Sequence, residues 1–594
     1  MVRWDRRRWS NWAGDVVVER PERHYYPTTR QDLLEIVGAA ERRQPPPEVR
    51  AGGSHWSFSD IAVCRHWLVE TRGLRATLYD VIPAALTDRA RHDLMGQDPA
   101  GPLYSFYHVE AGALIHEVNL RLDRRPLPEA DRAWARLPVD AIAGPWPGAG
   151  QRWALPTMGG AAGQTLAGAI STGTHGGDHD LPPMADMVMA VELVGPGGRH
   201  WWIERDTAIT DRDRIRALRP GVEYRACTEL FDAVLVSAGR MGIVYAYVLR
   251  VVGQFGLEQV TRASSWEDEA AGLRAPFRGF DQPRPGRDVA ERTRFVEALI
   301  VPYADRRGRH TCHLTSRWTV PVPEGDPEPK GPDFFGLLCR HSTITPIVLV
   351  LIAVTVVVMA VSWFVPVVGP VLVGLAGLIL LGLLGLLVLA RVSLGALVAR
   401  ACNLANRLGR SGLVRRAVEA VLGRARPSVT RRDVGYELMD LAETGGECYR
   451  ADSLEVFFDA STDAHADFLE QDAFPAFVRS ARAGRTVAGY ISLRFTRRTS
   501  AMLGMQQGDP AASVEVALLQ GVEGNAEILH ALETAALRRG ATIHWGQRNT
   551  TDAAAVAAGY PRLPNWRQQL AEIIGAGHAG TFDNAFCAAR RLEP

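Results

Sequence analysis

The sequence predicts an α+β fold made of two units, with a stretch of membrane character interrupting the second unit. Three observations carry this prediction. The first third of the chain alternates short apolar stretches with amphipathic helical ones, which is typical of layered α/β and α+β structures. Beyond about residue 255, several segments alternate apolar and polar residues as strands of an antiparallel sheet do. Between two groups of these strands, residues 342–390 carry no charge.

Composition limits the classes of function. A chain of 594 residues is too long for one hydrophobic core, so two or three domains are expected. Its 67 basic and 66 acidic residues nearly cancel, which gives no support to nucleic-acid binding. The seven cysteines are dispersed without CxxC spacing, so we expect neither a metal site nor a disulfide framework, and the set suits a reducing compartment. The N-terminus is basic without an apolar core, so no secretory signal is expected.

The elements of the first third follow from local patterns. Residues 31–43 have apolar side chains at helical spacing and end in basic residues, which predicts a helix. Residues 47–60 predict a short strand that runs into a glycine turn. Residues 104–123 predict a strand followed by a helix.

Two glycine-rich stretches are candidates for ligand binding. Residues 50–61, "RAGGSHWSFSDI", place a histidine directly behind a turn whose amides could hold a phosphate, and His55 could also bond covalently to a cofactor. In residues 157–180, glycines alternate with hydroxyl residues, so the backbone could lie against a flat or anionic ligand. Neither stretch is a Rossmann fingerprint or a Walker loop. Taken alone, such glycines are equally typical of ordinary turns.

The ordered set of motifs is more specific than any one of them. "WSNWAG", "VRAGGSHWSFSDIA", "VEAGALIHEVNLRL", "MGGAAGQTLAGAISTGTHGG", "MVMAVELVGPGG" and "LVSAGRMGIVYAYVLRV" follow one another between residues 9 and 251. In this order the chain resembles the aldonolactone oxidase and alditol oxidase branch of the vanillyl-alcohol-oxidase flavoproteins, which includes oxidases of D-arabinono-1,4-lactone and L-gulonolactone. The resemblance covers roughly residues 8–255. It implies a PCMH-type domain of two α+β subdomains that binds extended FAD, covered by a cap domain.

The resemblance also implies the domain bounds and the residues that bind FAD. The FAD domain would be residues 1–255, the cap would be residues 256–335 and 431–594, and residues 336–430 would be inserted in the cap. The pyrophosphate would contact Gly52, Gly53, Ser54, His55, Trp56 and Ser57. The flavin ring and ribityl chain would contact Gly159, Gly160, Thr165, Gly168, Ser171, Thr172, Thr174, His175 and Gly176. The adenine side would contact Gly242, Ile243 and Val244.

The flavin linkage stays open. Many members of the branch have a GSGHS-like turn whose histidine is bonded to the flavin. Aligned without a gap, Trp56 takes the histidine position here, and His55 could reach the flavin only if the turn shifts by one residue. We favour non-covalent FAD, with His55 bonding a phosphate or packing under the flavin ring.

The cap motifs imply a changed substrate site. Residues 294–303, 310–320, 453–461 and 489–498 predict strands. Within them, "ISLRFTRR" resembles a family strand whose arginine, here Arg494, faces the flavin and could stabilise developing negative charge. The family's acidic residue is Ser492 here, and in "IHWGQRN" Gln547 replaces a lysine. His544 could then act as a neutral general base; a purely structural role for it stays open. Arg494, His544 and Gln547 are the predicted catalytic residues.

Residues 342–390 predict a transmembrane hairpin. The stretch is long enough for two spans, and Pro366, Gly369 and Pro370 suggest a turn at its centre. Arginines flank both ends, so we expect both ends, and the catalytic domain, on the cytoplasmic side. The alternative is a buried core hairpin of a soluble domain, and a re-entrant rather than a spanning hairpin also stays open.

Two functions remain. The first is a membrane-anchored FAD-dependent oxidoreductase that oxidises a CH–OH group of an aldonolactone, alditol or related polyol, with dioxygen or a quinone as acceptor. Gly159 beside the flavin would leave room for dioxygen. The second is a flavin-binding, membrane-tethered scaffold whose substrate site has decayed, as Ser492 and Gln547 suggest. A transporter or channel is excluded, since two helices without intramembrane charge offer no ion path.

Overall fold

The computed structural model describes residues 2–95, 104–126, 151–275, 277–325, 394–425, 429–440, 450–575, 577–578 and 580–594. The predicted membrane hairpin at residues 342–390 lies outside these residues. Within the described ranges, none of the helices is both long enough and apolar enough to cross a membrane.

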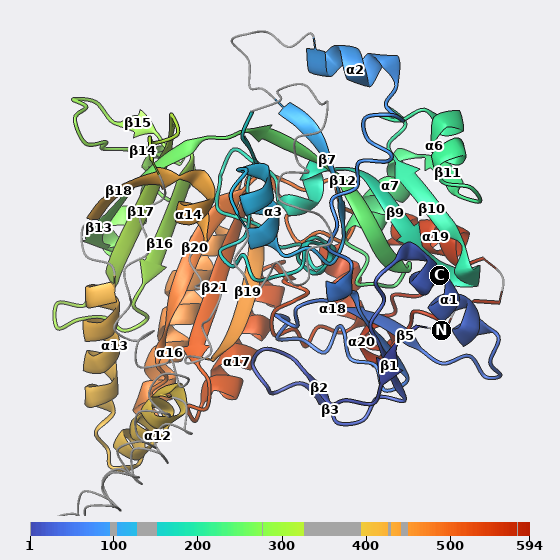
Figure 1. The fold of residues 1–594 in the computed structure, drawn as a ribbon. Coiled ribbons are helices and arrows are strands. Elements are labelled where there is room, and N and C mark those ends of the chain that lie inside the picture. Colours follow the sequence, from blue (N-terminus) through green and yellow to red (C-terminus); the bar gives the residue numbers. More distant parts are fainter. Residues whose placement is uncertain are drawn as a thin grey trace, which may run out of the picture.

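The N-terminal half contains two sheets, seen on the right of Figure 1. In the first sheet β4, β6 and β5 run parallel, β1 joins antiparallel to β4, and α1 packs its apolar residues Leu33 and Val37 against them. A capping box of Thr29 and Asp32 begins α1, which is why the predicted helix starts where it does. The bounds are β1 Trp4–Asp5, β4 Arg23–Tyr25, α1 Arg30–Glu41, β5 Val49–Gly52 and β6 Trp67–Glu70; the hairpin β2 Trp9–Ser10 and β3 Val17–Val18 lies beside them.

The second sheet has the order β11-β10-β9-β12-β7, with β8 paired to β12. Strand β12 is hydrogen-bonded on both sides, and its inward residues Tyr247 and Leu249 are buried in the main core. The bounds are β7 Tyr104–Glu110, β8 Trp153–Ala154, β9 Val188–Val194, β10 His200–Glu204, β11 Glu223–Ala226 and β12 Ile243–Gly253, with α2 Asp88–Met95, α3 Ile115–Leu122, α5 Leu166–Ser171, α6 Arg212–Leu218 and α7 Thr228–Leu235.

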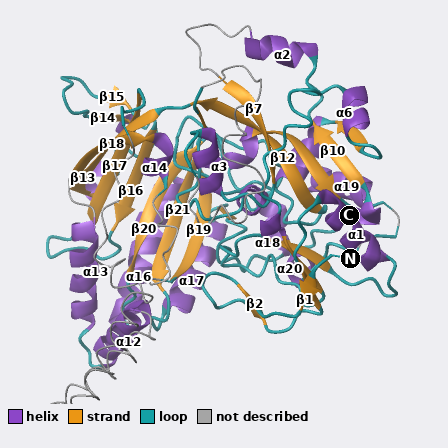
Figure 2. Ribbon diagram, viewed as in Figure 1, coloured by secondary structure: helices purple, strands orange, loops and turns teal. Residues whose placement is uncertain are grey.

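The second half is one antiparallel sheet of eight strands in the order β18-β13-β17-β16-β20-β21-β19-β22, which we call the cap sheet (Figure 2). The predicted strands at 294–303, 310–320, 453–461 and 489–498 are its β16, β17, β19 and β20. The bounds are β13 Gly256–Ser265, β16 Phe295–Ile300, β17 Thr311–Val320, β18 Val429–Val434, β19 Ala451–Asp459, β20 Gly489–Thr496, β21 Ala511–Leu519 and β22 Thr542–Ile543; β14 Asp281–Gln282 and β15 Glu291–Arg292 form a separate hairpin.

Helices pack on the cap sheet around a core of its own, which includes Phe468, Phe477 and Leu529. Helices α12 and α13 follow the undescribed residues and lie at the outer edge of this half in Figure 1. The bounds are α8 Trp266–Glu269, α12 Leu394–Arg407, α13 Ser411–Ala425, α14 Gly435–Met439, α15 Ala464–Asp467, the π-helical turn Phe468–Ala473, α16 Phe474–Arg482 and α17 Asn525–Arg538.

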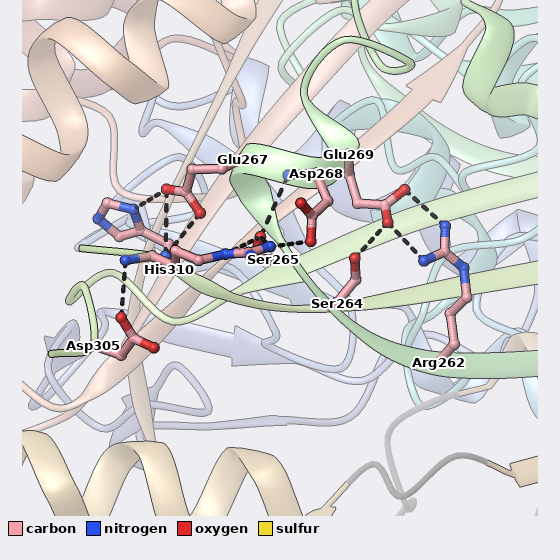
Figure 3. A network of polar contacts seen from close by, with 9 residues as sticks. Arg262, Ser264, Ser265, Glu267, Asp268, Glu269, Asp305 and His310 are labelled. Atoms are coloured by element: carbon pink, nitrogen blue, oxygen red, sulfur yellow. Dashed lines mark hydrogen bonds and ion pairs between the residues drawn. The ribbon is translucent and has the colours of Figure 1, made fainter. Parts of the chain in front are cut away.

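A polar cluster fixes the crossing between β13 and α8 (Figure 3). Ser265 caps α8 by accepting from the amide of Asp268. Glu267 accepts from the amide and the ring Nδ1 of His310, at 3.0 and 2.8 Å. Arg262 donates to both carboxylate oxygens of Glu269. These bonds satisfy the polar groups of a short helix, so we assign the cluster a structural role.

The C-terminal segment returns to the N-terminal half, where both termini are labelled close to α1 in Figure 1. Helices α18 Ala553–Gly559, α19 Leu563–Ile574 and α20 Ala585–Ala589 form it, and Phe582 joins the core beneath α1. Buried Arg50 on β5 ties it in by donating to the carbonyls of Phe582, Ile61 and Ala238 at 3.0, 2.6 and 2.5 Å.

Replacing Arg50 should therefore uncouple the C-terminal segment from β5. Arg50→Met leaves the buried carbonyls of Phe582 and Ala238 without this donor, whereas the Ile61 carbonyl still accepts from Asn584 Nδ2 at 3.1 Å. At about 1 kcal/mol each, the two losses should lower the free energy of unfolding by roughly 2 kcal/mol. Thermal unfolding would measure this against Arg287→Met, which removes only an exposed ion pair to Glu291 and should cost less than about 1 kcal/mol. Equal stability of the two variants would contradict the role given to Arg50.

Candidate active site

One cavity of about 480 Å³ lies between the two glycine-rich stretches and the cap sheet. This volume falls within the roughly 300–1,000 Å³ of small-molecule sites. All but two of the predicted site residues line it: Gly52, Gly53, Ser54, His55, Trp56, Ser57, Gly159, Gly160, Thr165, Gly168, Ser171, Thr172, Thr174, His175, Gly242, Val244, Arg494, His544 and Gln547. The sequence motifs, distant along the chain, are thus brought to one place.

The turn after β5 forms the first wall. Gly53 lies so close to the second glycine stretch that a Cβ there would be 2.0 Å from Thr165 Oγ1. Ser54 Oγ accepts from the Thr165 amide at 2.9 Å, and Thr165 in turn caps α5 through the amide of Gly168. Glycine at position 53 is therefore required by the close approach of the turn to the Thr165 side chain rather than by an unusual φ.

His55 and Trp56 leave this turn in different directions. His55 adopts the left-handed conformation, with φ 64°, and its Nε2 lies 3.6 Å from Glu70 Oε2, with the ring edge on Trp9. Trp56 stacks on Trp12 with ring centroids 5.5 Å apart. Burial outweighs the attraction of Glu70 and lowers the pKa of His55 to about 4, so His55 is neutral near pH 7.

The second wall comes from the stretch at residues 157–177. A Cβ on Gly159 would lie 2.5 Å from the methyl carbon of Thr174, and one on Gly163 would lie 2.8 Å from the Trp56 ring. Glycine is thus needed at both positions for packing within this wall, and Gly159, Gly160 and Gly168 line the cavity. A flat ligand could approach it closely.

The third wall is one face of the cap sheet. In the register of the strands, Glu297 lies opposite Arg494, Glu515 lies opposite Ser492, and Glu455 lies opposite Glu515. Directly opposed residues share a face, as do residues two apart on a strand. The sheet therefore gathers three carboxylates and one guanidinium on the side that faces the cavity.

Arg494 is the centre of this charged cluster. Its Nη2 donates to Glu455 Oε1 at 3.0 Å and to Glu515 Oε2 at 2.8 Å. His175, from the second glycine stretch, places Nε2 3.0 Å from Glu455 Oε1, while its Nδ1 lies 2.7 Å from the carbonyl of Gly176. Both partners of His175 are acceptors, so each of its ring nitrogens lies against an oxygen.

The pKa values of Glu455 and Glu515 are shifted in opposite directions. Burial acts to raise the pKa of Glu455, but the charges of His175 and Arg494 outweigh it and hold that pKa below its ordinary value. For Glu515, burial and the negative charges of Glu455 and Glu297 outweigh Arg494, so its pKa is raised. Pairs of carboxyls separated in this way are typical of sites that transfer protons.

His544 lies at the edge of the cluster, with Nε2 4.0 Å from Glu455 Oε2. Burial lowers its pKa to about 4 despite Glu455, so it is neutral near pH 7. Its Nδ1 accepts from the Gly546 amide at 2.9 Å, which places the single proton on Nε2. Neither ring nitrogen then offers a free lone pair.

Three predicted positions differ from expectation. Gly176 is not among the lining residues, because a Cβ there would meet Thr157 and the carbonyl of Met158. Ile243 points into the core beneath α1 and is fully buried. Ser492, at the position of the family's acidic residue, is buried and donates to Glu297 at 3.0 Å instead of lining the cavity.

Sequence reasoning missed the three carboxylates. Glu455 sits within the predicted strand "SLEVFFDAS" and Glu297 within "RFVEALIVPY", where an acidic residue among apolar ones is the only signal. Glu515 lies in β21, which was not predicted.

Several buried polar atoms of residues that line the cavity have no hydrogen-bond partner among the described residues: His55 Nε2, Gln164 Oε1, Arg494 Nε and Gln547 Oε1. Such atoms are rare in folded proteins and are satisfied by water or by a ligand. Glycine-lined backbone, aromatic rings and unpartnered polar atoms together fit a group that combines a flat ring with polar substituents, as FAD does.

Comparison with curated proteins supports distant homology, although no family model matches the chain. It is similar to L-gulono-1,4-lactone dehydrogenase of Mycobacterium tuberculosis, 23% identical over 315 residues that cover 53% of this chain and 54% of that protein. It is also 23% identical over 258 residues to D-arabinono-1,4-lactone oxidase of Eremothecium gossypii, covering 43% of this chain and 36% of that protein. The chain thus spans about half the length of the first relatives, and less of the others.

Solved structures show the fold. Cholesterol oxidase from B. sterolicum superimposes with a TM-score of 0.61 over 100% of this chain and 98% of that one, at 12% identity. A solvent-stable cholesterol oxidase gives 0.59 at 13% identity, over 96% of this chain. The chain is therefore a distant homologue of the sugar-lactone oxidases and dehydrogenases, and its α+β fold is like that of cholesterol oxidase. The resemblance drawn from the motifs is confirmed at this level.

The close approach at Gly53 can be tested by adding one methyl group. Gly53→Ala forces the turn away from Thr165, which cannot yield without losing its cap on α5, and should cost about 1–3 kcal/mol. Gly412→Ala, where a Cβ meets nothing within 4 Å in α13, should instead raise stability by roughly 0.5–1 kcal/mol. Thermal unfolding of both variants measures the difference, and a neutral Gly53→Ala would show that the two stretches do not touch.

Proposed function

We propose that the protein is an FAD-dependent oxidoreductase that oxidises a CH–OH group of a sugar-derived substrate such as an aldonolactone or alditol. The observation that carries the proposal is the charged cluster around Arg494, set on the cap sheet across the cavity from the glycine stretches. Distant homology to the sugar-lactone oxidases and dehydrogenases supports the substrate class.

FAD would be held by the turn at residues 52–57, by the stretch at residues 159–175, and by Gly242 and Val244. Bound FAD supplies the acceptor for the hydride that leaves the substrate carbon. We favour non-covalent binding, because His55 is placed beside Glu70 and Trp9 and Trp56 is stacked on Trp12.

Glu515 is the group best suited to take the hydroxyl proton. Its raised pKa makes it a stronger base than Glu455, which is held as a carboxylate by His175 and Arg494. Its side chain keeps 19% of its exposure, and it lines the cavity. His544 was the predicted base, but its hydrogen bond from Gly546 favours a positioning role.

Arg494 would stabilise and orient the substrate oxygen, while His175, whose ring nitrogens meet Glu455 and the Gly176 carbonyl, would hold Glu455 in place. Arg494 lines the cavity and carries a permanent positive charge, so its guanidinium would stabilise that oxygen as negative charge grows on it. The substrate thus loses a proton to Glu515 and a hydride to the cofactor, a two-electron oxidation from alcohol to carbonyl.

The charged cluster weighs against the alternative of a decayed scaffold. Burying charges costs several kcal/mol each unless they are paired. Here Glu515 stands opposite Ser492, so a carboxylate from the neighbouring strand replaces the acid missing from position 492. We therefore rank the scaffold second.

The membrane and the electron acceptor remain part of the proposal. We propose that residues 342–390 anchor the enzyme in a membrane with the catalytic domain on the cytoplasmic side, because the stretch is uncharged and flanked by arginines. Dioxygen and a membrane quinone are the two candidate acceptors.

The first experiment is a visible spectrum of the detergent-solubilised chain, repeated on the supernatant after acid precipitation. Flavin absorbance that moves into the supernatant is expected, since Trp56 takes the position of the family histidine and His55 lies against Glu70 and Trp9. Colour retained in the pellet would mean that His55 holds the cofactor. A colourless chain that FAD cannot reconstitute would overturn the proposal.

Glu515→Gln tests the assignment of the base. With the substrate that reduces the flavin fastest among L-gulono-1,4-lactone, D-arabinono-1,4-lactone and alditols, kcat should fall about 10²–10⁴-fold. A base works only when deprotonated, so wild-type kcat/KM should fall as the pH drops through the raised pKa of Glu515, and this limb should vanish in the variant. Glu527→Gln, a cap carboxylate with 65% exposure, should leave kcat unchanged. If kcat/KM of Glu515→Gln still falls at low pH as in the wild type, another group takes the hydroxyl proton.

A further inference from the structure

Helices α12 and α13 expose apolar side chains to an unusual degree. Seven large hydrophobic residues are exposed among the described residues, and four of them lie on or between these two helices. They are Val398, Leu404, Leu408 and Leu413, with exposed fractions of 37, 58, 66 and 55%. Such a gathering on one short segment marks an interaction surface.

Leu404 and Leu408 form a second apolar face at the C-terminal end of α12. Ala399, Cys402 and Asn406, at intervals of three and four, are buried against the cap. Leu404 and Leu408 repeat at the same spacing on a different side, one that the cap does not cover. The helix therefore has an inner face of small residues that packs on the cap, and an outer face of larger residues that no described part of the chain covers. We call Leu404 and Leu408 the outer face; Val398 and, on α13, Leu413 are exposed beside it.

The cap holds this outer face in a fixed orientation. Asn406 Nδ2 donates to the Thr486 carbonyl at 2.9 Å. Asn403 donates to the carbonyl of Gly521 at 2.9 Å and accepts from the Glu523 amide at 2.8 Å. Ala399, Cys402 and Val414 belong to the core of the cap domain. The outer face is thus presented by a docked helix pair rather than by a free tail.

Arginines surround the outer face. Arg400, Arg410 and Arg416 are exposed, and no ion pair is described for any of them. Arg407 pairs with Glu523, and Arg415 donates to the carbonyl of Ala304. Leucines with arginines beside them are the composition of helices that lie in the plane of a bilayer whose headgroups are anionic.

The sequence before α12 also favours contact of the outer face with a membrane. The uncharged residues end at Ala390, and α12 begins at Leu394. We propose that the outer face lies on the anionic leaflet of a lipid bilayer, and that it sets the orientation of the cap over the membrane. This inference rests on the proposed membrane association, and it adds a defined contact surface that a simple tether would lack.

The test uses the full chain in vesicles of phosphatidylcholine with or without phosphatidylglycerol. An environment-sensitive fluorophore is attached to a cysteine introduced at Leu404, Leu408 or, as control, Val289, which is 76% exposed on the β14–β15 hairpin. Flotation after an alkaline wash reports anchoring independently of the label, and the flavin spectrum reports cofactor binding.

With phosphatidylglycerol present, labels at positions 404 and 408 should shift to the blue and be quenched by lipids that carry a nitroxide at the level of roughly 5–10 Å below the surface. The Val289→Cys label should do neither. Replacing Arg400, Arg410 and Arg416 by glutamine should weaken the contact about fivefold per arginine, corresponding to ~1 kcal/mol each.

Three results would overturn the inference. If the chain floats with the vesicles but the labels at 404 and 408 stay in water, the tether exists and the docked surface does not. If these labels are already shielded without lipid, another part of the chain or a second copy covers the outer face. If the chain neither floats nor shifts its labels, membrane association itself fails, while the flavin spectrum still judges the oxidoreductase proposal separately.

Discussion

The contact between His175 and Glu455 is the interaction on which the rest of the site depends. His175 belongs to the glycine-rich stretch of the N-terminal half, and Glu455 belongs to β19 of the cap sheet. His175 also meets the Gly176 carbonyl through Nδ1, so both of its ring nitrogens lie against acceptors. A buried polar contact of this kind fixes position strongly, since breaking it would leave buried polar atoms without a hydrogen bond. It therefore holds the glycine backbone at a set distance from the charged face of the cap.

The acidity of the cluster follows from its charges. His175 and Arg494 both lower the pKa of Glu455, so Glu455 stays ionised. Glu515 shares Arg494 with it but also faces Glu455 and Glu297, so its proton is held more tightly. A carboxyl whose pKa is raised towards the working pH is a more effective base than one that is permanently ionised. The same guanidinium thus separates two chemically identical residues into an anchor and a proton acceptor.

The sequence predicted the parts of this site that are local and left out those that depend on strand register. The turn at 52–57 and the stretch at 159–175 could be predicted because glycines and hydroxyl residues that act together lie next to one another. Arg494 was found through a short strand motif. Glu515 and Glu455 could not be found in this way, because their proximity exists only once β21 is paired with β19 and β20, and a register shift of one residue would move them to the other face. For the same reason Ser492 suggested a missing charge that the opposite strand provides.

Helix α12 illustrates a second limit of sequence patterns. Its periodicity shows apolar residues on more than one side, and periodicity alone does not say which side meets the protein. The structure decides it through polar residues: Asn403 and Asn406 pair with backbone groups of the cap, and these bonds can form in one rotation of the helix only. Small residues such as Ala399 then face inward, and Leu404 and Leu408 are turned outward. Two amide side chains thus determine that the larger apolar surface of this helix is left for a partner outside the fold.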